Sequence, residues 1–166
     1  MLGDINVSGT SGAGVQLLRD NSEFTMTGNI ATSGQGGDGL NILGDYNTVS
    51  LTGDITLLEE NALGPQDAIT IIGDSNNVTI TGNVTSNAST GPRGSYGSGL
   101  YISSGTSNTI VLNGNMTMTG NGPGEAIELD TSNSNTITMT GNISTVGDTA
   151  HGIGLDTSDS NTLNIT

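Results

Sequence analysis

This sequence lacks cysteine, lysine and tryptophan, and it has very few aromatic side chains. The absence of cysteine excludes a disulfide framework and a thiolate metal site. One Phe, three Tyr and an apolar fraction of 31% leave too little bulk for a thick core. Either the interior is narrow or the chain is disordered, because low hydrophobicity with a net charge of −14 is also typical of disordered proteins.

The shortage of positive charge excludes two classes of partner. Arg19 and Arg93 are the only arginines, and the chain carries 16 carboxylates. So few cations cannot neutralise a phosphate backbone or an anionic membrane surface, so we expect no nucleic-acid partner. No run approaches the roughly 20 apolar residues of a membrane span, so we expect no membrane insertion by this segment. Residues 1–6 do not resemble the start of a signal peptide, so an exported protein would begin upstream.

What the chain does contain is an internal repeat. Six units of 25 to 32 residues, each headed by a glycine, cover residues 3–166 without a gap. Each unit holds three short segments in which apolar and polar residues alternate, separated by Gly, Asn, Asp and Ser. This pattern is typical of strands and turns rather than helices. The units begin at Gly3, Gly28, Gly53, Gly82, Gly114 and Gly141.

Apolar residues recur at the same offsets in all six units. The first segments share Ile5, Ile30, Ile55, Val84, Met116 and Ile143. The second segments share the pairs Val15/Leu17, Leu40/Ile42, Ile69/Ile71, Leu100/Ile102, Ile127/Leu129 and Ile153/Leu155. The third segments share Phe24/Met26, Val49/Leu51, Val78/Ile80, Ile110/Leu112, Ile137/Met139 and Leu163/Ile165. A disordered polar chain would not place aliphatic residues at matching offsets six times.

These offsets predict an all-β fold, a right-handed parallel β-helix with three strands in each of six coils. Alternate residues of a strand point to opposite faces, so the shared apolar residues would line a narrow interior. Coils stacked at about 4.8 Å would form a rod roughly 30 Å long. We predict a single β-helix segment, residues 3–166, that is open at both ends.

Asparagine is expected to form a structural ladder at one corner of the coil. It stands two residues before the third segment's first apolar residue, except in the first unit, where Ser22 takes its place. Asparagine tolerates a left-handed backbone at a sharp turn, and stacked amides can hydrogen-bond along the axis. The ladder consists of Asn47, Asn76, Asn108, Asn135 and Asn161.

The units resemble the passenger repeats of autotransporter adhesins, the type V secreted surface proteins of Gram-negative bacteria. The resemblance is carried by the run NTITMTGNI at 135–143 and by GDTAHGIGLD at 147–156, whose Ala-His-Gly-Ile core occurs once. It extends over essentially the whole chain. The resemblance implies an extracellular rod at a bacterial cell surface that mediates attachment, aggregation or display, usually without catalysis.

Three carboxylates in the second segments are the candidate catalytic or metal-binding residues. Glu128 is expected to point outward, and Asp130 and Asp156 are equivalent positions one coil apart, about 5 Å from each other. Clustered acids of this kind serve glycosidases and bind Ca²⁺. However, no Lys or Arg is placed to bind an acidic sugar, and no aromatic platform is available. We therefore predict no catalytic residue, no metal and no cofactor, with a polysaccharide-degrading enzyme and a calcium site as alternatives.

The single histidine, His151, aligns with Glu125 one coil earlier. A lone histidine without neighbouring ligands does not predict a metal site. We expect instead a surface pair, which contributes about 0–1 kcal/mol.

The third segments present a polar outward surface rich in threonine. Flat Thr-x-Thr arrays occur on ice-binding β-solenoids, so ice binding is a further alternative function. Because threonine is also a favourable exposed strand residue and the array is interrupted, we interpret it as structural. The outward pairs are Thr25/Thr27, Ser50/Thr52, Thr79/Thr81, Val111/Asn113, Thr138/Thr140 and Asn164/Thr166.

The sequence thus favours a non-catalytic, extracellular structural or adhesive rod. Two coils are enlarged between their first and second segments, at residues 59–66 and 87–97, and insertions on one face of a solenoid often form its binding face. Arg93, Tyr96 and Tyr101 are the candidate contacts for a host or cell-surface glycan or protein. The bare ends predict either continuation of a longer β-helix or head-to-tail self-association into a filament.

Overall fold

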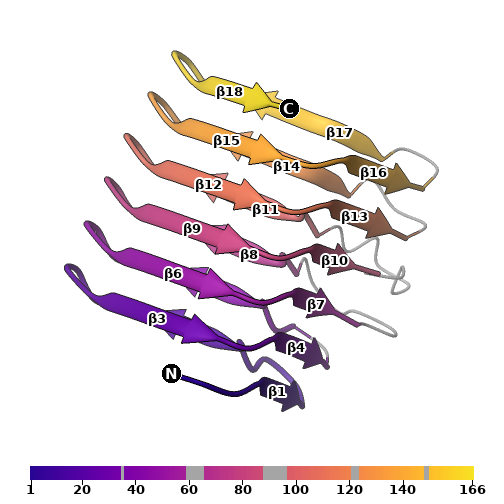
Figure 1. Ribbon diagram of the computed structural model, residues 1–166. Helices are drawn as coiled ribbons and strands as arrows, with labels where there is room; N and C mark the ends of the chain where they lie inside the picture. Colours follow the sequence, from indigo (N-terminus) through magenta and orange to yellow (C-terminus); the bar gives the residue numbers. More distant parts are fainter. Residues whose placement is uncertain (35, 59–65, 88–96, 121–123, 148–149) are drawn as a thin grey trace.

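The computed structural model describes residues 1–34, 36–58, 66–87, 97–120, 124–147 and 150–166. All regular structure in these ranges is β-strand, and the strands lie one above another in successive coils (Figure 1). Among the described residues there is accordingly no helix that is long and apolar enough to cross a membrane.

The strands form three parallel sheets, each of six strands, and every coil contributes one strand to each sheet. The first sheet contains β1 (Ile5–Ser8), β4 (Ile30–Ser33), β7 (Ile55–Leu57), β10 (Val84–Ser86), β13 (Met116–Thr119) and β16 (Ile143–Val146). The second contains β2 (Val15–Leu17), β5 (Leu40–Ile42), β8 (Ile69–Ile71), β11 (Leu100–Ser103), β14 (Glu125–Asp130) and β17 (His151–Asp156). The third contains β3 (Glu23–Thr27), β6 (Thr48–Thr52), β9 (Asn77–Thr81), β12 (Thr109–Asn113), β15 (Thr136–Thr140) and β18 (Thr162–Ile165).

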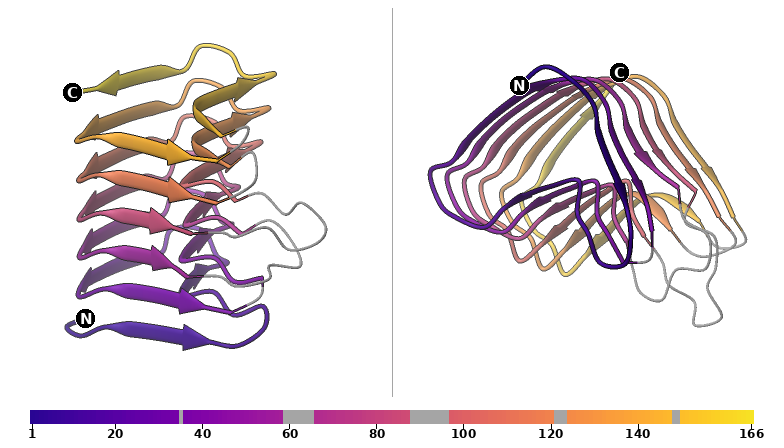
Figure 2. Two further views of the ribbon diagram at one scale, coloured as in Figure 1. Left: turned by 90° about the vertical axis from the view of Figure 1, so that its right-hand side faces the viewer. Right: turned by 90° about the horizontal axis from the view of Figure 1, so that it is seen from below.

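The predicted parallel β-helix is confirmed, with three strands in each coil. Viewed along the stack, the coils overlie one another around a common axis (Figure 2). The shared apolar positions of the repeat are register partners in all three sheets, as in Ile30 with Ile55, Leu40 with Ile69, and Val49 with Val78. The glycine-headed units therefore correspond to the coils of the structure.

The interior consists of aliphatic columns that run along the axis. In the central coils the inward side chains are fully buried, for example Ile55, Ile71 and Ile80 at 0% exposure. In the last coil the equivalent side chains are less buried: Ile143 is half-buried, and Leu155 is 54% exposed. Burial of apolar area is the main stabilising contribution, so each central coil depends on the coils above and below it.

The asparagine ladder connects consecutive coils through the backbone. The side-chain oxygen of Asn47 accepts a hydrogen bond from the N–H of Ser22 at 2.7 Å, and Asn76 accepts one from the N–H of Asn47 at 2.8 Å. The same bond recurs as far as the pair Asn135 and Asn161. The amides of Asn47, Asn76, Asn108 and Asn135 are buried, and Asn161 in the last coil is half-buried. In the central coils each bond therefore satisfies a backbone donor that is buried away from water.

The expectation that the ladder asparagines adopt the left-handed conformation was wrong by one residue. The positive φ angle belongs to the residue just before each ladder position, as at Ser75 with φ 58° and Ser107 with φ 59°. The turn is made there because the asparagine side chain must point into the coil to accept the N–H of the neighbouring coil. Asn21 and Tyr46 make the equivalent turns in the first two coils.

The glycines that head the units are required by close approach between coils. Gly53 has a φ of 151°, and a β-carbon at this position would collide with the carbonyl group of Gly28 in the preceding coil. The same contact recurs at Gly82 and Gly114. Any larger residue at these corners would force the stacked turns apart.

Candidate functional site

Carboxylates gather on the outer side of the second sheet. Residues that alternate with the inward aliphatics point away from the core, because successive strand residues face opposite sides. We call the six acidic residues in or just before these strands the acidic face. In the third sheet, whose strands are all described, Glu23 is the one carboxylate. The acidic face consists of Asp38, Asp67, Glu125, Glu128, Asp130 and Asp156.

Asp38 and Asp67 are joined by a single hydroxyl group. The backbone N–H of Asp67 donates to Oδ1 of Asp38 at 3.1 Å. The Oγ1 atom of Thr70, on β8, lies 3.2 Å from Oδ2 of Asp38 and 3.3 Å from Oδ2 of Asp67. Asn41 on β5 donates its Nδ2 to the same Oδ2 of Asp38 at 3.0 Å. The two carboxyl groups of adjacent coils are therefore held against each other.

Asp67 is the most buried member of the acidic face, with 8% exposure. Burial raises the pKa of Asp67 to about 7. The backbone N–H of Ser98, which donates to its Oδ1, opposes this rise, whereas the negative charges of Asp38 and Glu128 add to it. Burial also raises the pKa of Asp38, against the hydrogen bonds from Asp67 and Thr70.

The next two coils extend this hydrogen-bonded network. The hydroxyl of Ser98 donates to Oε2 of Glu128 on β14 at 2.6 Å. The phenol of Tyr101 on β11 lies 3.5 Å from Oδ2 of Asp130, which is a long hydrogen bond. Burial raises the pKa of Tyr101, and the charges of Asp130 and Glu128 raise it further, while a hydrogen bond with Ser103 lowers it.

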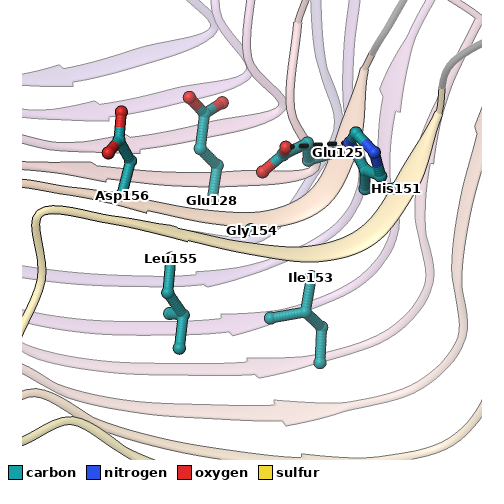
Figure 3. A pocket seen from close by; sticks show the side chains of 7 residues that line it. All are labelled: Glu125, Glu128, His151, Ile153, Gly154, Leu155 and Asp156. Carbon is teal, nitrogen blue, oxygen red and sulfur yellow. Dashed lines mark ion pairs between the residues drawn. The ribbon is translucent and has the colours of Figure 1, made fainter.

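An open pocket of about 380 Å³ lies at the C-terminal end of the acidic face. Its polar wall contains Glu125 and His151, whose Oε1 and Nδ1 atoms are 3.3 Å apart (Figure 3). Glu128 and Asp156 point to the same side of the strands, whereas Ile153 and Leu155 point to the other (Figure 3). The absence of a side chain at residue 154 creates this space, because a β-carbon there would collide with the Glu125 carboxylate.

The pKa of the Glu125 carboxyl group lies above its ordinary value. Burial raises its pKa, the charge of Glu128 adds to the rise, and His151 lowers it. A carboxyl group with a raised pKa beside other carboxylates is an arrangement used in acid catalysis. The described residues that line the pocket include no Lys, Arg, Tyr or Trp.

The structure places the three candidate ligands as the repeat predicts, but it does not assemble them into a cation site. Asp130 and Asp156 are register partners on β14 and β17, and Glu128 points outward. Thr131 and Thr157 donate to Oδ1 of Asp130 and Asp156 at 2.8 and 3.4 Å. Within the described ranges, no group of three or more His, Cys, Asp or Glu residues has the geometry of a metal site.

The candidate contact residues are only partly within the described chain. Arg93 and Tyr96 lie outside the described residues, as do most of the enlarged segments 59–66 and 87–97. Tyr101 is on β11, between Thr70 and Glu128 in the outward column of the second sheet. Tyr101 therefore lies next to Glu128 of the acidic face.

Exposed aliphatic side chains continue the same outer surface toward the N-terminal coils. Leu18, Leu43 and Ile72 directly follow the last inward residues of β2, β5 and β8. Their exposed fractions are 59%, 37% and 46%. The equivalent residues farther along the sheet are Ser103, Asp130 and Asp156. This one column, at the end of each second-sheet strand, thus changes from aliphatic to polar and acidic along the rod, whereas Asp38 and Asp67 lie at the start of the strands in the same coils as Leu43 and Ile72.

Sequence reasoning missed the network around Asp67. The signal was present, because a small residue precedes the first inward residue of each second-sheet strand. The residue before that small residue is polar in five consecutive coils. Polar contacts join Asp38 to Asp67, Asp67 to Ser98, and Glu125 to His151. This column consists of Asp38, Asp67, Ser98, Glu125 and His151.

The outward residues of the third sheet are in register from coil to coil. Thr25, Ser50 and Thr79 are register partners, and the column continues through Val111 to Thr138. The valine interrupts the column of hydroxyl groups in β12, as the sequence indicates.

Comparison with known protein families, with curated proteins and with solved structures found no match in any of the three.

Proposed function

We propose that this chain is a non-catalytic, extracellular β-helical rod that serves as a stalk or adhesive surface, similar to the passengers of bacterial autotransporter adhesins. The observation that carries the proposal is which groups the polar residues form hydrogen bonds with. The buried ladder asparagines bond to backbone groups of neighbouring coils, and Asp38 and Asp67 of the acidic face do the same. Such groups build a rod rather than a reaction centre.

The outer surface of the second sheet is the proposed contact surface for a cell-surface glycan or protein. It combines exposed aliphatic side chains with carboxylates, and the enlarged segments of the repeat adjoin its strands in sequence. Solenoids commonly bind through the face that carries their insertions. Tyr101 lies in this surface, and Arg93 and Tyr96 precede it in the chain.

Adhesion of coated beads to bacterial and host cells tests this proposal. Beads carrying the chain are expected to bind, and replacement of Arg93, Tyr96 and Tyr101 by alanine is expected to reduce binding severalfold. The matched control replaces Ser50, Thr79 and Thr138 on the third sheet by alanine and is expected to bind normally. Equal binding by both triple variants would reject the contact surface, and no binding by the original chain would reject the adhesive role.

A second candidate, a filament formed by head-to-tail stacking of copies, is favoured by the terminal coils. Ile153 and Leu155 are 41% and 54% exposed, whereas their equivalents Ile127 and Leu129 are buried. A second copy placing Val15 and Leu17 above them would continue both columns. Electron microscopy with light scattering over a wide concentration range tests this candidate. Fibres that grow by end addition would support it, and short rods at every concentration would reject it.

Removal of Met1 and Leu2 gives a variant that tests the filament directly. They pair with β3 in the place that a preceding coil's third strand would occupy, with Thr27 N–H donating to the Met1 carbonyl at 2.9 Å. The β18 strand of a stacked copy would need the same place. Head-to-tail growth therefore predicts faster fibre formation by a chain that begins at Gly3.

A further inference from the structure

The number of protons available to Asp38, Thr70 and Asp67 does not match the number of hydrogen bonds between them. Oγ1 of Thr70 is within hydrogen-bond distance of both carboxyl groups, at 3.2 and 3.3 Å. A hydroxyl group has one hydrogen, so Thr70 can donate to only one of them. The second contact becomes a hydrogen bond only if that carboxyl group carries a proton and donates it to Oγ1.

Asp67 is the carboxyl group better suited to carry this proton. It is 8% exposed, whereas Asp38 is only partly buried. Asp38 already accepts two N–H groups, from Asp67 and from Asn41 at 3.1 and 3.0 Å, which stabilise its negative charge. A proton on Oδ2 of Asp67 completes a chain in which Asp67 donates to Thr70 and Thr70 donates to Asp38.

The surroundings of Asp67 give its negative charge little compensation. From the β5 side it faces Asp38, and from the β11 and β14 side it faces Ser98, Tyr101 and Glu128. Among the groups that act on its pKa, the charged ones are Asp38 and Glu128, and both raise it. Only the N–H of Ser98 and the hydroxyl of Thr70 act in the opposite direction.

We propose that Asp67 and Asp38 share one proton through Thr70. These three residues then form a pH-sensitive contact between adjacent coils, which we call the clasp. In acid, two hydrogen bonds, from Asp67 to Thr70 and from Thr70 to Asp38, join the adjacent coils. Loss of the proton leaves two adjacent carboxylates and one hydroxyl, so the repulsion loosens the contact between the coils.

The direction of the pH effect follows from the proton bound in the folded state. Since the pKa of Asp67 is raised to about 7 by folding, the folded chain holds a proton between about pH 4 and pH 7 that the unfolded chain releases. Its contribution to stability is complete below about pH 4 and is lost as the pH rises through about 7. The melting temperature should therefore fall over this interval.

Carbon-13 NMR of the aspartate carboxyl groups, combined with thermal unfolding against pH, tests the proposal. One aspartate resonance is expected to titrate near neutral pH and to be absent in Asp67→Asn. An amide at this position donates permanently to Thr70 and accepts from Ser98. Asp67→Asn is therefore expected to match the original chain's melting temperature in acid and to lose most of its decline toward neutral pH.

Asp54→Asn provides a control with the same change in net charge. Asp54 accepts the N–H of Asn83 at 2.7 Å in a turn, a bond that an amide oxygen retains, so this variant should keep the original pH profile. The proposal is overturned if every aspartate of the original chain titrates below about pH 5. It is equally overturned if Asp67→Asn folds and retains the full decline. The titration of the original chain decides the question even if that variant does not fold.

Discussion

The side-chain oxygen of Asn108 accepts the backbone N–H of Asn76, its counterpart one coil earlier, at 2.8 Å. The Nδ2 atom of Asn108 donates to the carbonyl oxygen of Gly73 at 2.9 Å. One buried amide thus satisfies a backbone donor and a backbone acceptor of the preceding coil. The arrangement recurs at Asn135 and Asn161, whose Nδ2 atoms donate to the carbonyl oxygens of Gly105 and Ser132. At Asn47 and Asn76 the side-chain oxygen accepts the backbone N–H in the same way, but Nδ2 is buried without a partner among the described residues.

Replacement of Asn108 by alanine should therefore be strongly destabilising. It leaves the N–H of Asn76 and the carbonyl of Gly73 buried without partners, and each such group costs about 1–3 kcal/mol. We expect a loss of about 2–4 kcal/mol in the free energy of unfolding, measured with a chemical denaturant. The matched control is Asn83→Ala, which removes a similar bond to Asn115 in an exposed turn and should cost less than about 1 kcal/mol. Equal losses would contradict the role assigned to the buried ladder.

A comparison of two aliphatic positions tests the dependence of each coil on its neighbours. Ile71 is fully buried in the third coil, and its replacement by alanine should cost about 2–5 kcal/mol. Leu155 occupies the equivalent position in the last coil but is 54% exposed, so Leu155→Ala should cost less than half as much. Denaturant unfolding of both variants gives the comparison. Similar losses at the two positions would indicate that the last coil is covered in solution.

The pair of Glu125 and His151 should influence acidity more than stability. The side chain of His151 is 66% exposed, so His151→Ala should change the free energy of unfolding by no more than about 1 kcal/mol. Because His151 lowers the pKa of Glu125, its removal should shift the titration of Glu125 to higher pH. Carbon-13 NMR of the glutamate carboxyl groups measures this shift. An unchanged or lowered midpoint would show that the two side chains do not interact in solution.

Calcium is expected to have no effect on the folded chain. The proposed function needs no metal, and Asp130 and Asp156 are already bonded to Thr131 and Thr157. Addition of Ca²⁺ should leave the melting temperature unchanged and produce no heat in calorimetry. A rise in melting temperature that disappears in Asp130→Asn together with Asp156→Asn would establish the calcium site that the sequence offered as an alternative.

The coil boundaries and the inward columns could be predicted from the sequence because stacking repeats the same environment in every coil. An inward position such as Ile55 meets Ile30 on one side and Val84 on the other, so the same residue type is favoured throughout. The alternation within each strand then determines the opposite face. Periodicity carries this information without any knowledge of the turns.

The details of the corner and of the acidic network could not be predicted in the same way. Periodicity aligns Asn76 with Asn108 but does not say which residue of the turn has a positive φ, and the structure shows that Ser75 does. Nor does alignment reveal burial. Neither Asp38 nor Asp67 was singled out from the sequence, although Asp67 is only 8% exposed between the coils on either side. Such properties depend on the path of the chain through the corner, which a repeat alone does not specify.

The most direct test of the account is incubation of the chain with a panel of acidic and neutral polysaccharides, followed by measurement of both retention and newly formed chain ends. A non-catalytic rod predicts that no new ends form with any polysaccharide, whether or not the polysaccharide is retained. Release of oligosaccharides that is abolished by Glu125→Gln or Glu128→Gln would contradict the account and would identify the pocket beside His151 as an active site.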